Sequence, residues 1–213
     1  MTKVIVLSVV LSLLVFGSGI FLGYGFQKRT LTQSNAQLDE IRKEINQMQT
    51  MILFSTLGKN FTCSYYEFML QKIGDRLEAV TEQVISMEKD VHLTSKESRE
   101  STIAELMNLR LQYWVLAENY RRQCDPDYHT ILYFYRVKPT CYECEVEGQV
   151  LAELSQKCDV AVAPISLNVD LDTISLLTQV YNVSLEDAPV LIIDGNQKLQ
   201  GLVTLDELNE TIC

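Results

Sequence analysis

Two cysteines three positions apart are the residues of this chain best suited to chemistry. The motif Cys141-Tyr142-Glu143-Cys144 follows a short apolar run and precedes a stretch with helical spacing. A cysteine at a helix N-terminus faces unpaired backbone N–H groups and the positive end of the helix dipole, and both favour the thiolate that attacks disulfides. We therefore predict Cys141 as the exposed, attacking thiol and Cys144, one helical turn later, as the more buried, resolving thiol.

The elements that must position this pair are indicated by apolar patterns between residues 129 and 213. Short β-rich apolar runs predict strands at 130–135, 160–168, 189–194 and 198–202. Helical spacing predicts helices at 145–157, at 171–181 and after Thr204, where Glu207 completes a capping box. The order is β-α-β-α-β-β-α, which predicts an α/β domain around a central mixed sheet.

This order, with the cysteine pair between the first strand and the first helix, resembles the thioredoxin superfamily. The resemblance covers residues 129–213 and rests on the Cys-x-x-Cys pair, on Ala188-Pro189 before a hydrophobic strand, and on Gly195 in a hairpin. In that family the proline is cis and faces the active-site disulfide, so the resemblance implies a substrate-binding role for Ala188 and Pro189.

The resemblance also bears on the last two cysteines. It places Cys158 and Cys213 at the same end of two helices on one face of the sheet, where they could form a structural disulfide. The alternative is that Cys213 is a frayed end and Cys158 a lone buried thiol.

The sequence departs from the family pattern at several points. Thr140 stands where thioredoxins commonly have tryptophan, and no strand-helix unit precedes the first strand unless the helices upstream take its place. The first strand has no aspartate to accept a proton from Cys144. Glu143, Glu145 and Glu147 add negative charge near the pair, which opposes thiolate formation.

Of three interpretations of the cysteine pair, two remain open. The first is a dithiol–disulfide oxidoreductase acting on protein thiols through Cys141 and Cys144. The second is a non-catalytic binding or scaffold module in which the pair is structural and the helices assemble partners. A metal site is disfavoured because it needs about four ligands and only Cys158 lies near the pair, so we expect no metal and no cofactor.

Residues 62–124 predict an antiparallel helical hairpin. Ser64 with Glu67, and Thr94 with Glu97, have the spacing of capping boxes that begin two helices. Cys63 and Cys124 are equally far along the chain from the junction near residue 93, so they should meet at the open end of the hairpin. A disulfide is the favoured interpretation, and two separate buried thiols are the alternative.

The N-terminal part indicates a membrane anchor and a stalk. Residues 4–26 contain no charged side chain over 23 positions, enough for a transmembrane helix. Residues 30–57 predict a helical stalk, in which residues 31–52 carry a heptad seam typical of a coiled coil. That seam would pair two copies in a homodimer or pack on the hairpin as a third helix.

Charge and cysteine content bear on partners and compartment. Residues 130–213 hold 13 acidic and 4 basic side chains, which disfavours nucleic acid as a partner. Lys28 and Arg29 after the apolar run favour a cytoplasmic C-terminal part, whereas six cysteines in apparent pairs favour an oxidising compartment. We predict a single-pass membrane protein with an extracytoplasmic C-terminal part, acting on protein thiols or disulfides and recycled by a membrane redox partner.

Overall fold

The computed structural model describes residues 59–89 and 95–213. The predicted anchor at 4–26, the stalk at 30–57 and the seam at 31–52 lie outside the described residues. Within the described ranges, no helix combines the length and the apolar character needed to cross a membrane. The elements are α2 (Lys59–Lys89), α3 (Lys96–Gln123), β1 (His129–Tyr135), α4 (Tyr142–Lys157), β2 (Val160–Ser166), α5 (Asp172–Tyr181), η1 (Leu185–Asp187), β3 (Val190–Ile193), β4 (Gln197–Gln200) and α6 (Leu205–Ile212).

The four strands form one mixed sheet in the order β2-β1-β3-β4. Strand β1 pairs parallel to β2, whereas β3 runs antiparallel to both β1 and β4. All four residues of β3 are buried, because helices cover both faces of the sheet at this position. The mixed sheet and the order of its elements confirm the α/β arrangement predicted for residues 129–213.

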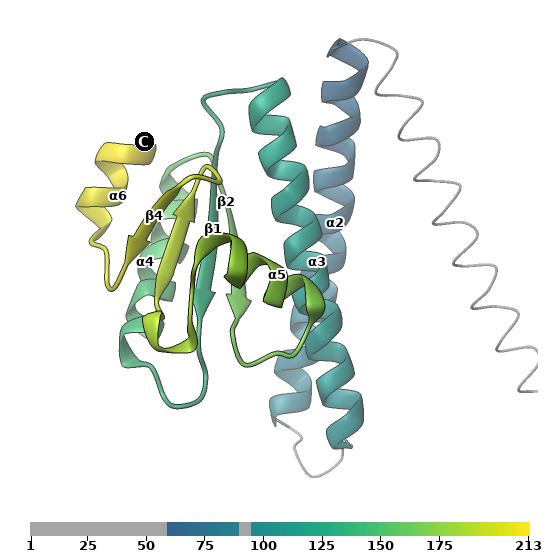
Figure 1. Cartoon of the computed structure of the whole chain (residues 1–213). Helices are drawn as coiled ribbons and strands as arrows, with labels where there is room; N and C mark the ends of the chain where they lie inside the picture. The colour runs from purple at the N-terminus through teal and green to yellow at the C-terminus, as the bar shows by residue number, and fades with distance from the viewer. Residues whose placement is uncertain (1–58, 90–94) are drawn as a thin grey trace, which may run out of the picture. The chain divides into compact units, whose positions relative to one another are not determined.

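One face of the sheet packs against the helical hairpin and α5. Leu132 and Phe134 of β1 point to this face, where they join Met107 and Trp114 of α3 and Ile174 of α5 in one buried cluster. In Figure 1, α3 lies between the sheet and α2, so the hairpin forms a layer of the fold. The upstream helices therefore cover a sheet face that would otherwise be exposed.

The opposite face packs against α4 and α6. Ile131 and Tyr133 point to this face because successive side chains of a strand alternate between its two sides. They meet Leu151 and Leu154 of α4 and Leu208 of α6 in a second buried cluster. Both cysteines of the Cys-x-x-Cys pair belong to this second cluster, so the core that packs around them includes α6.

The hairpin is present, but two of its predicted boundaries are wrong. Helix α2 begins at Lys59, so the capping box predicted at Ser64 does not start it. Helix α3 is capped by Ser95, whose hydroxyl accepts the N–H of Ser98. Thr94, the predicted cap, lies outside the described residues. The neighbouring serine supplies the oxygen that satisfies a free N–H of the first turn.

A buried charged network joins the hairpin to the sheet. The Glu118 carboxylate, with a side chain only 8% exposed, accepts hydrogen bonds from Arg121, Arg122 and the hydroxyl of Thr130 in β1. Burial alone would raise the pKa of Glu118, but these hydrogen bonds outweigh it and hold the pKa below its ordinary value. Gly195 in the β3–β4 turn has φ +72°, and an added Cβ there would lie 3.2 Å from Glu118 Oε1. The hairpin therefore lies against the sheet at this turn.

Element ends in the C-terminal part differ from prediction by a few residues. Helix α4 begins at Tyr142, three residues earlier than predicted, because Cys141 itself caps it. A short 3-10 helix, η1, was not predicted; the Ser184 and Asp187 side chains cap it reciprocally. The capping box of Thr204 and Glu207 at the start of α6 is confirmed.

Candidate functional site

Cys141 occupies the cap position at the N-terminus of α4. Its sulfur atom accepts the backbone N–H of Cys144 at 3.1 Å, as the oxygen of a capping serine or aspartate would. The two cysteines are joined by a disulfide with 5.2 Å between their Cα atoms. In the reduced protein the same N–H group and the helix dipole would stabilise a thiolate at Cys141.

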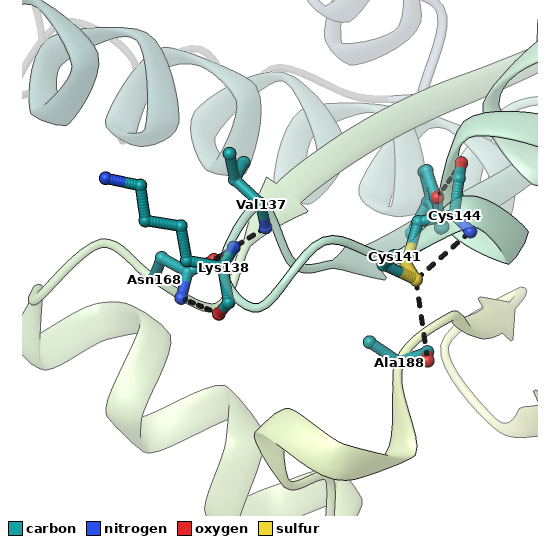
Figure 2. The surroundings of a disulfide bond; sticks show 7 residues. Val137, Lys138, Cys141, Cys144, Asn168 and Ala188 are labelled. Atoms are coloured by element: carbon teal, nitrogen blue, oxygen red, sulfur yellow. Dashed lines mark hydrogen bonds between the residues drawn. A yellow bond between two sulfur atoms is a disulfide. The ribbon is translucent and has the colours of Figure 1, made fainter.

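The loop before β3 closes over this sulfur atom. The peptide bond between Ala188 and Pro189 is cis, and the Ala188 carbonyl oxygen lies 3.8 Å from Cys141 Sγ. Figure 2 shows Ala188 directly beside the disulfide, on the side away from α4. The structure thus brings together the four residues that the sequence predicted for the site, which are Cys141, Cys144, Ala188 and Pro189.

Strand order, helix placement and the cis-proline loop together define the architecture around the pair. Residues 129–213 have a thioredoxin-like fold. The helical hairpin covers the sheet face where a strand-helix unit ahead of β1 was missing from the sequence.

Comparisons with known proteins match this chain to thioredoxins among solved structures. No protein-family model and no curated protein matches the chain. A mutant thioredoxin from Halobacterium salinarum NRC-1 is 25% identical, with 39% of this chain and 71% of that chain covered and a TM-score of 0.33. Oxidised thioredoxin O2 from Arabidopsis thaliana is 22% identical, with 48% and 84% covered and a TM-score of 0.33. At these TM-scores the fold assignment depends on the topology described above.

The prediction that Cys141 is exposed is wrong for the oxidised protein. Cys141 is 6% exposed and Cys144 is 5% exposed, so the two differ little in burial. The cause is the Ala188 carbonyl, which covers Cys141 from a segment 47 residues further along the chain. The neighbouring Tyr142, at the start of α4, is by contrast 76% exposed.

The segment that leads into Cys141 is fixed by one asparagine. Asn168 Oδ1 accepts the backbone N–H groups of Val137 and Lys138 at 2.6 and 3.0 Å, and its Nδ2 donates to the Lys138 carbonyl at 2.7 Å (Figure 2). Three hydrogen bonds from one side chain hold the turn after β1 to the segment after β2. This turn carries the second cis peptide, between Lys138 and Pro139, two residues before Cys141.

A buried acid, Glu147, follows the pair on α4, and the sequence indicated its charge but not its burial. Glu147 is fully buried; its Oε2 accepts the Val203 N–H at 2.8 Å, and its Oε1 is buried with no hydrogen-bond partner among the described residues. Burial raises the pKa of Glu147 against the lowering effect of the Val203 N–H, and the charge of Glu207 raises it further. The signal was present, since Cys144, Glu147 and Leu151 follow helical spacing on one stripe.

Tyr133 connects the strand to the pair. Its hydroxyl donates to the Cys144 carbonyl at 2.6 Å, which ties the first turn of α4 to strand β1. Burial raises the pKa of Tyr133, and the charges of Glu147 and Tyr135 add to the effect. The tyrosine therefore remains protonated and acts as a fixed donor.

The other predicted site residues lie away from the pair. Cys63 and Cys124 form a disulfide with Cα atoms 5.5 Å apart, at the open end of the hairpin. Cys158 and Cys213 form another, also at 5.5 Å, between the ends of α4 and α6. Within residues 59–89 and 95–213, no three His, Cys, Asp or Glu side chains lie close enough to hold a metal ion.

Proposed function

We propose that the thioredoxin-like domain carries out thiol–disulfide exchange on protein substrates through Cys141 and Cys144. The observation that supports this most is the capping geometry: the Cys141 sulfur accepts the Cys144 N–H at the start of α4. A thiolate formed there gains the helix dipole and a hydrogen bond that a thiol in another position would lack. Lowered thiol pKa and access to a partner are what exchange requires.

In the proposed reaction, the Cys141 thiolate attacks one sulfur of a substrate disulfide and a mixed disulfide forms. Cys144 then attacks Cys141, which closes the bond seen in the structure and releases the substrate as a dithiol. The Ala188 carbonyl lies beside the attacking sulfur, where the backbone of a bound substrate segment would approach. The reverse sequence oxidises a substrate dithiol, and the reduction potential decides which direction prevails.

A redox titration tests this function, with the other two disulfides of the chain as internal controls for the Cys141–Cys144 pair. The purified protein is equilibrated in glutathione redox buffers, trapped with an alkylating reagent and mapped by mass spectrometry. We expect Cys141–Cys144 to become partly reduced between about −120 and −270 mV, the range of redox-active pairs. The disulfides Cys63–Cys124 and Cys158–Cys213 should stay oxidised there. If all three pairs stay oxidised together, the exchange function is wrong.

A structural role is the second candidate, and the burial of Cys141 favours it. A disulfide with both sulfur-bearing residues less than a tenth exposed resembles a core cross-link more than an open site. In that case the fold would act as a binding or scaffold module. The same redox titration separates the two functions, because a purely structural pair has no need to be reducible at moderate potential.

We also propose that residues 4–26 anchor the protein in a membrane, with the domain on the extracytoplasmic side and a membrane redox partner recycling the pair. The support is the uncharged 23-residue run and the three disulfides, which persist mainly in oxidising compartments. Alkaline carbonate extraction should leave the full chain in the membrane pellet and release a chain that lacks residues 1–29. Release of the full chain would contradict the anchor.

A further inference from the structure

Glu147 is the one acid of the thioredoxin-like domain that is fully buried. It follows Cys144 by three residues on α4, so the two side chains lie on the same helix face with Cβ atoms about 5–6 Å apart. Both residues face the cluster formed by β1, β3 and α6. A titratable group is therefore buried about one helical turn from the resolving cysteine, on the same side of α4.

The bonding of Glu147 leaves half of its carboxylate unsatisfied. Only Oε2 has a partner, the N–H of Val203, while Oε1 is buried without one in the described part of the chain. A buried carboxylate with a free oxygen is costly as an anion, and binding a proton removes most of that cost. The arrangement suits a group that alternates between its charged and neutral forms.

We propose that Glu147 accepts the proton of the Cys144 thiol as Cys144 attacks the mixed disulfide. The inference depends on the exchange reaction proposed above and adds to it a proton acceptor that α4 itself supplies. In the step, the thiol of Cys144 loses its proton to the Glu147 carboxylate and becomes a thiolate. The thiolate forms the bond to Cys141 Sγ, and the bond from Cys141 to the substrate sulfur breaks. The substrate leaves as a thiolate with the electron pair and takes a proton from water.

The groups that face Glu147 leave no competing acceptor among the described residues. From β1, Tyr133 already donates its hydroxyl hydrogen to the Cys144 carbonyl. From α6, Glu207 is exposed and its carboxylate accepts the N–H of Thr204 in a capping box. Strand β3 contributes only apolar side chains to this cluster. Proton transfer from Cys144 therefore has one buried carboxylate available to it.

The test isolates the resolving step. A mixed disulfide between Cys141 and thionitrobenzoate is formed from the reduced protein and Ellman's reagent, and release of the coloured thiol by Cys144 is followed in a stopped-flow instrument over a range of pH. The Glu147→Gln variant keeps the shape and the acceptor for Val203 N–H but cannot take the proton. Glu143→Gln and Glu145→Gln are matched controls, since they remove the same charge from exposed positions on the same helix.

We expect Glu147→Gln to slow release at neutral pH by about tenfold to a hundredfold, the lower part of what a positioned base contributes. Its rate should rise only as the thiol ionises at alkaline pH, whereas the parent rate should also follow ionisation of Glu147 at lower pH. The two controls should stay within about twofold of the parent. A Glu147→Gln variant with the parent rate and pH profile overturns the assignment, as do controls that lose as much.

A second measurement tests the same role without any substitution, in case the Glu147→Gln variant folds poorly. In the unmodified protein, the side-chain carboxyl signal of Glu147 is followed by carbon NMR with pH, once oxidised and once reduced. The titration midpoint should move when the pair is reduced, because Glu147 and Cys144 then titrate as a coupled pair. An identical midpoint in both states refutes the role of Glu147. If the parent protein never forms the mixed disulfide on Cys141, the proposed exchange function fails instead.

Discussion

Removal of the Cys63–Cys124 disulfide should destabilise the protein by an amount set mainly by chain entropy. The two cysteines are 61 positions apart, and closing a loop of that length in the unfolded chain corresponds to about 4 kcal/mol in the entropy model. The folded hairpin also keeps its helix packing and the Arg76–Glu105 ion pair at 2.8 Å, an exposed pair that adds little. We therefore expect the double variant Cys63→Ala/Cys124→Ala to remain folded and to lose about 2–4 kcal/mol of unfolding free energy.

Urea unfolding of the purified chain measures this loss, with two probes. Far-ultraviolet circular dichroism reports the helices, and fluorescence reports Trp114, the one tryptophan of the chain. Trp114 is 7% exposed in the cluster between the hairpin and the sheet, so its emission follows the docking of the two layers. The double variant Cys158→Ala/Cys213→Ala is the matched control, because its cysteines are 55 positions apart and the entropy model gives nearly the same loss.

Two results would refute this reasoning. A loss below about 1 kcal/mol would show that the unfolded hairpin already keeps its ends together, so the disulfide constrains little. Separate transitions for the two probes would show that the hairpin unfolds apart from the sheet, contrary to a shared core. Equal losses in the two double variants, with coincident transitions, support the entropic account.

Three further predictions concern single side chains. The pKa of Glu118 is lowered in the folded protein, so its ionised carboxylate stabilises the fold fully at pH values above the ordinary glutamate pKa. That stabilisation is lost as the pH falls through the pKa of the folded state. Glu118→Gln should therefore flatten the acid side of a plot of unfolding free energy against pH. Tyr133→Phe removes the donor to the Cys144 carbonyl and should lower the free energy of unfolding, measured in urea, by about 0.5–1.5 kcal/mol. An unchanged free energy of unfolding would show that this hydrogen bond does not stabilise the fold. Thr204→Ala, which breaks the capping box with Glu207, should lower the thermal midpoint through a loss of about 1 kcal/mol, whereas Thr204→Ser should keep it.

The order of elements could be predicted because it depends on local patterns. Strand alternation and helical spacing are properties of a few neighbouring residues, and in the described part of the chain they indicated β1 to β4 and every helix except η1. The meeting of Cys63 and Cys124 was also within reach, because equal distances from a helix junction fix which residues are opposite in an antiparallel pair. The start of α2 was not, since Asn60 is a weak helix former and Lys59 follows a glycine, the residue that commonly ends a helical pattern.

The details of the site required the tertiary structure. Glu143, Glu145 and Glu147 form one acidic run in the sequence, and only the packing of α4 on β1 and α6 makes the third of them buried. The burial of Cys141 likewise depends on the Ala188 carbonyl, which is distant in the chain. Local sequence patterns predict which face of a helix or strand a residue lies on, whereas contacts between elements decide which functional groups are buried.

The two edges of the sheet limit how this protein can associate with other chains. The outer strand β4 is only four residues long, exposed, and carries Lys198, whose amine donates to the carbonyls of Tyr181 and Asn182. The other edge, β2, contains Pro164, which has no N–H to offer, and Arg110 of α3 donates to the Pro164 carbonyl at 3.0 Å. Neither strand presents a long, regular row of free backbone groups, so edge-to-edge pairing is disfavoured. Concentrated preparations of the folded domain should accordingly resist aggregation through strand addition.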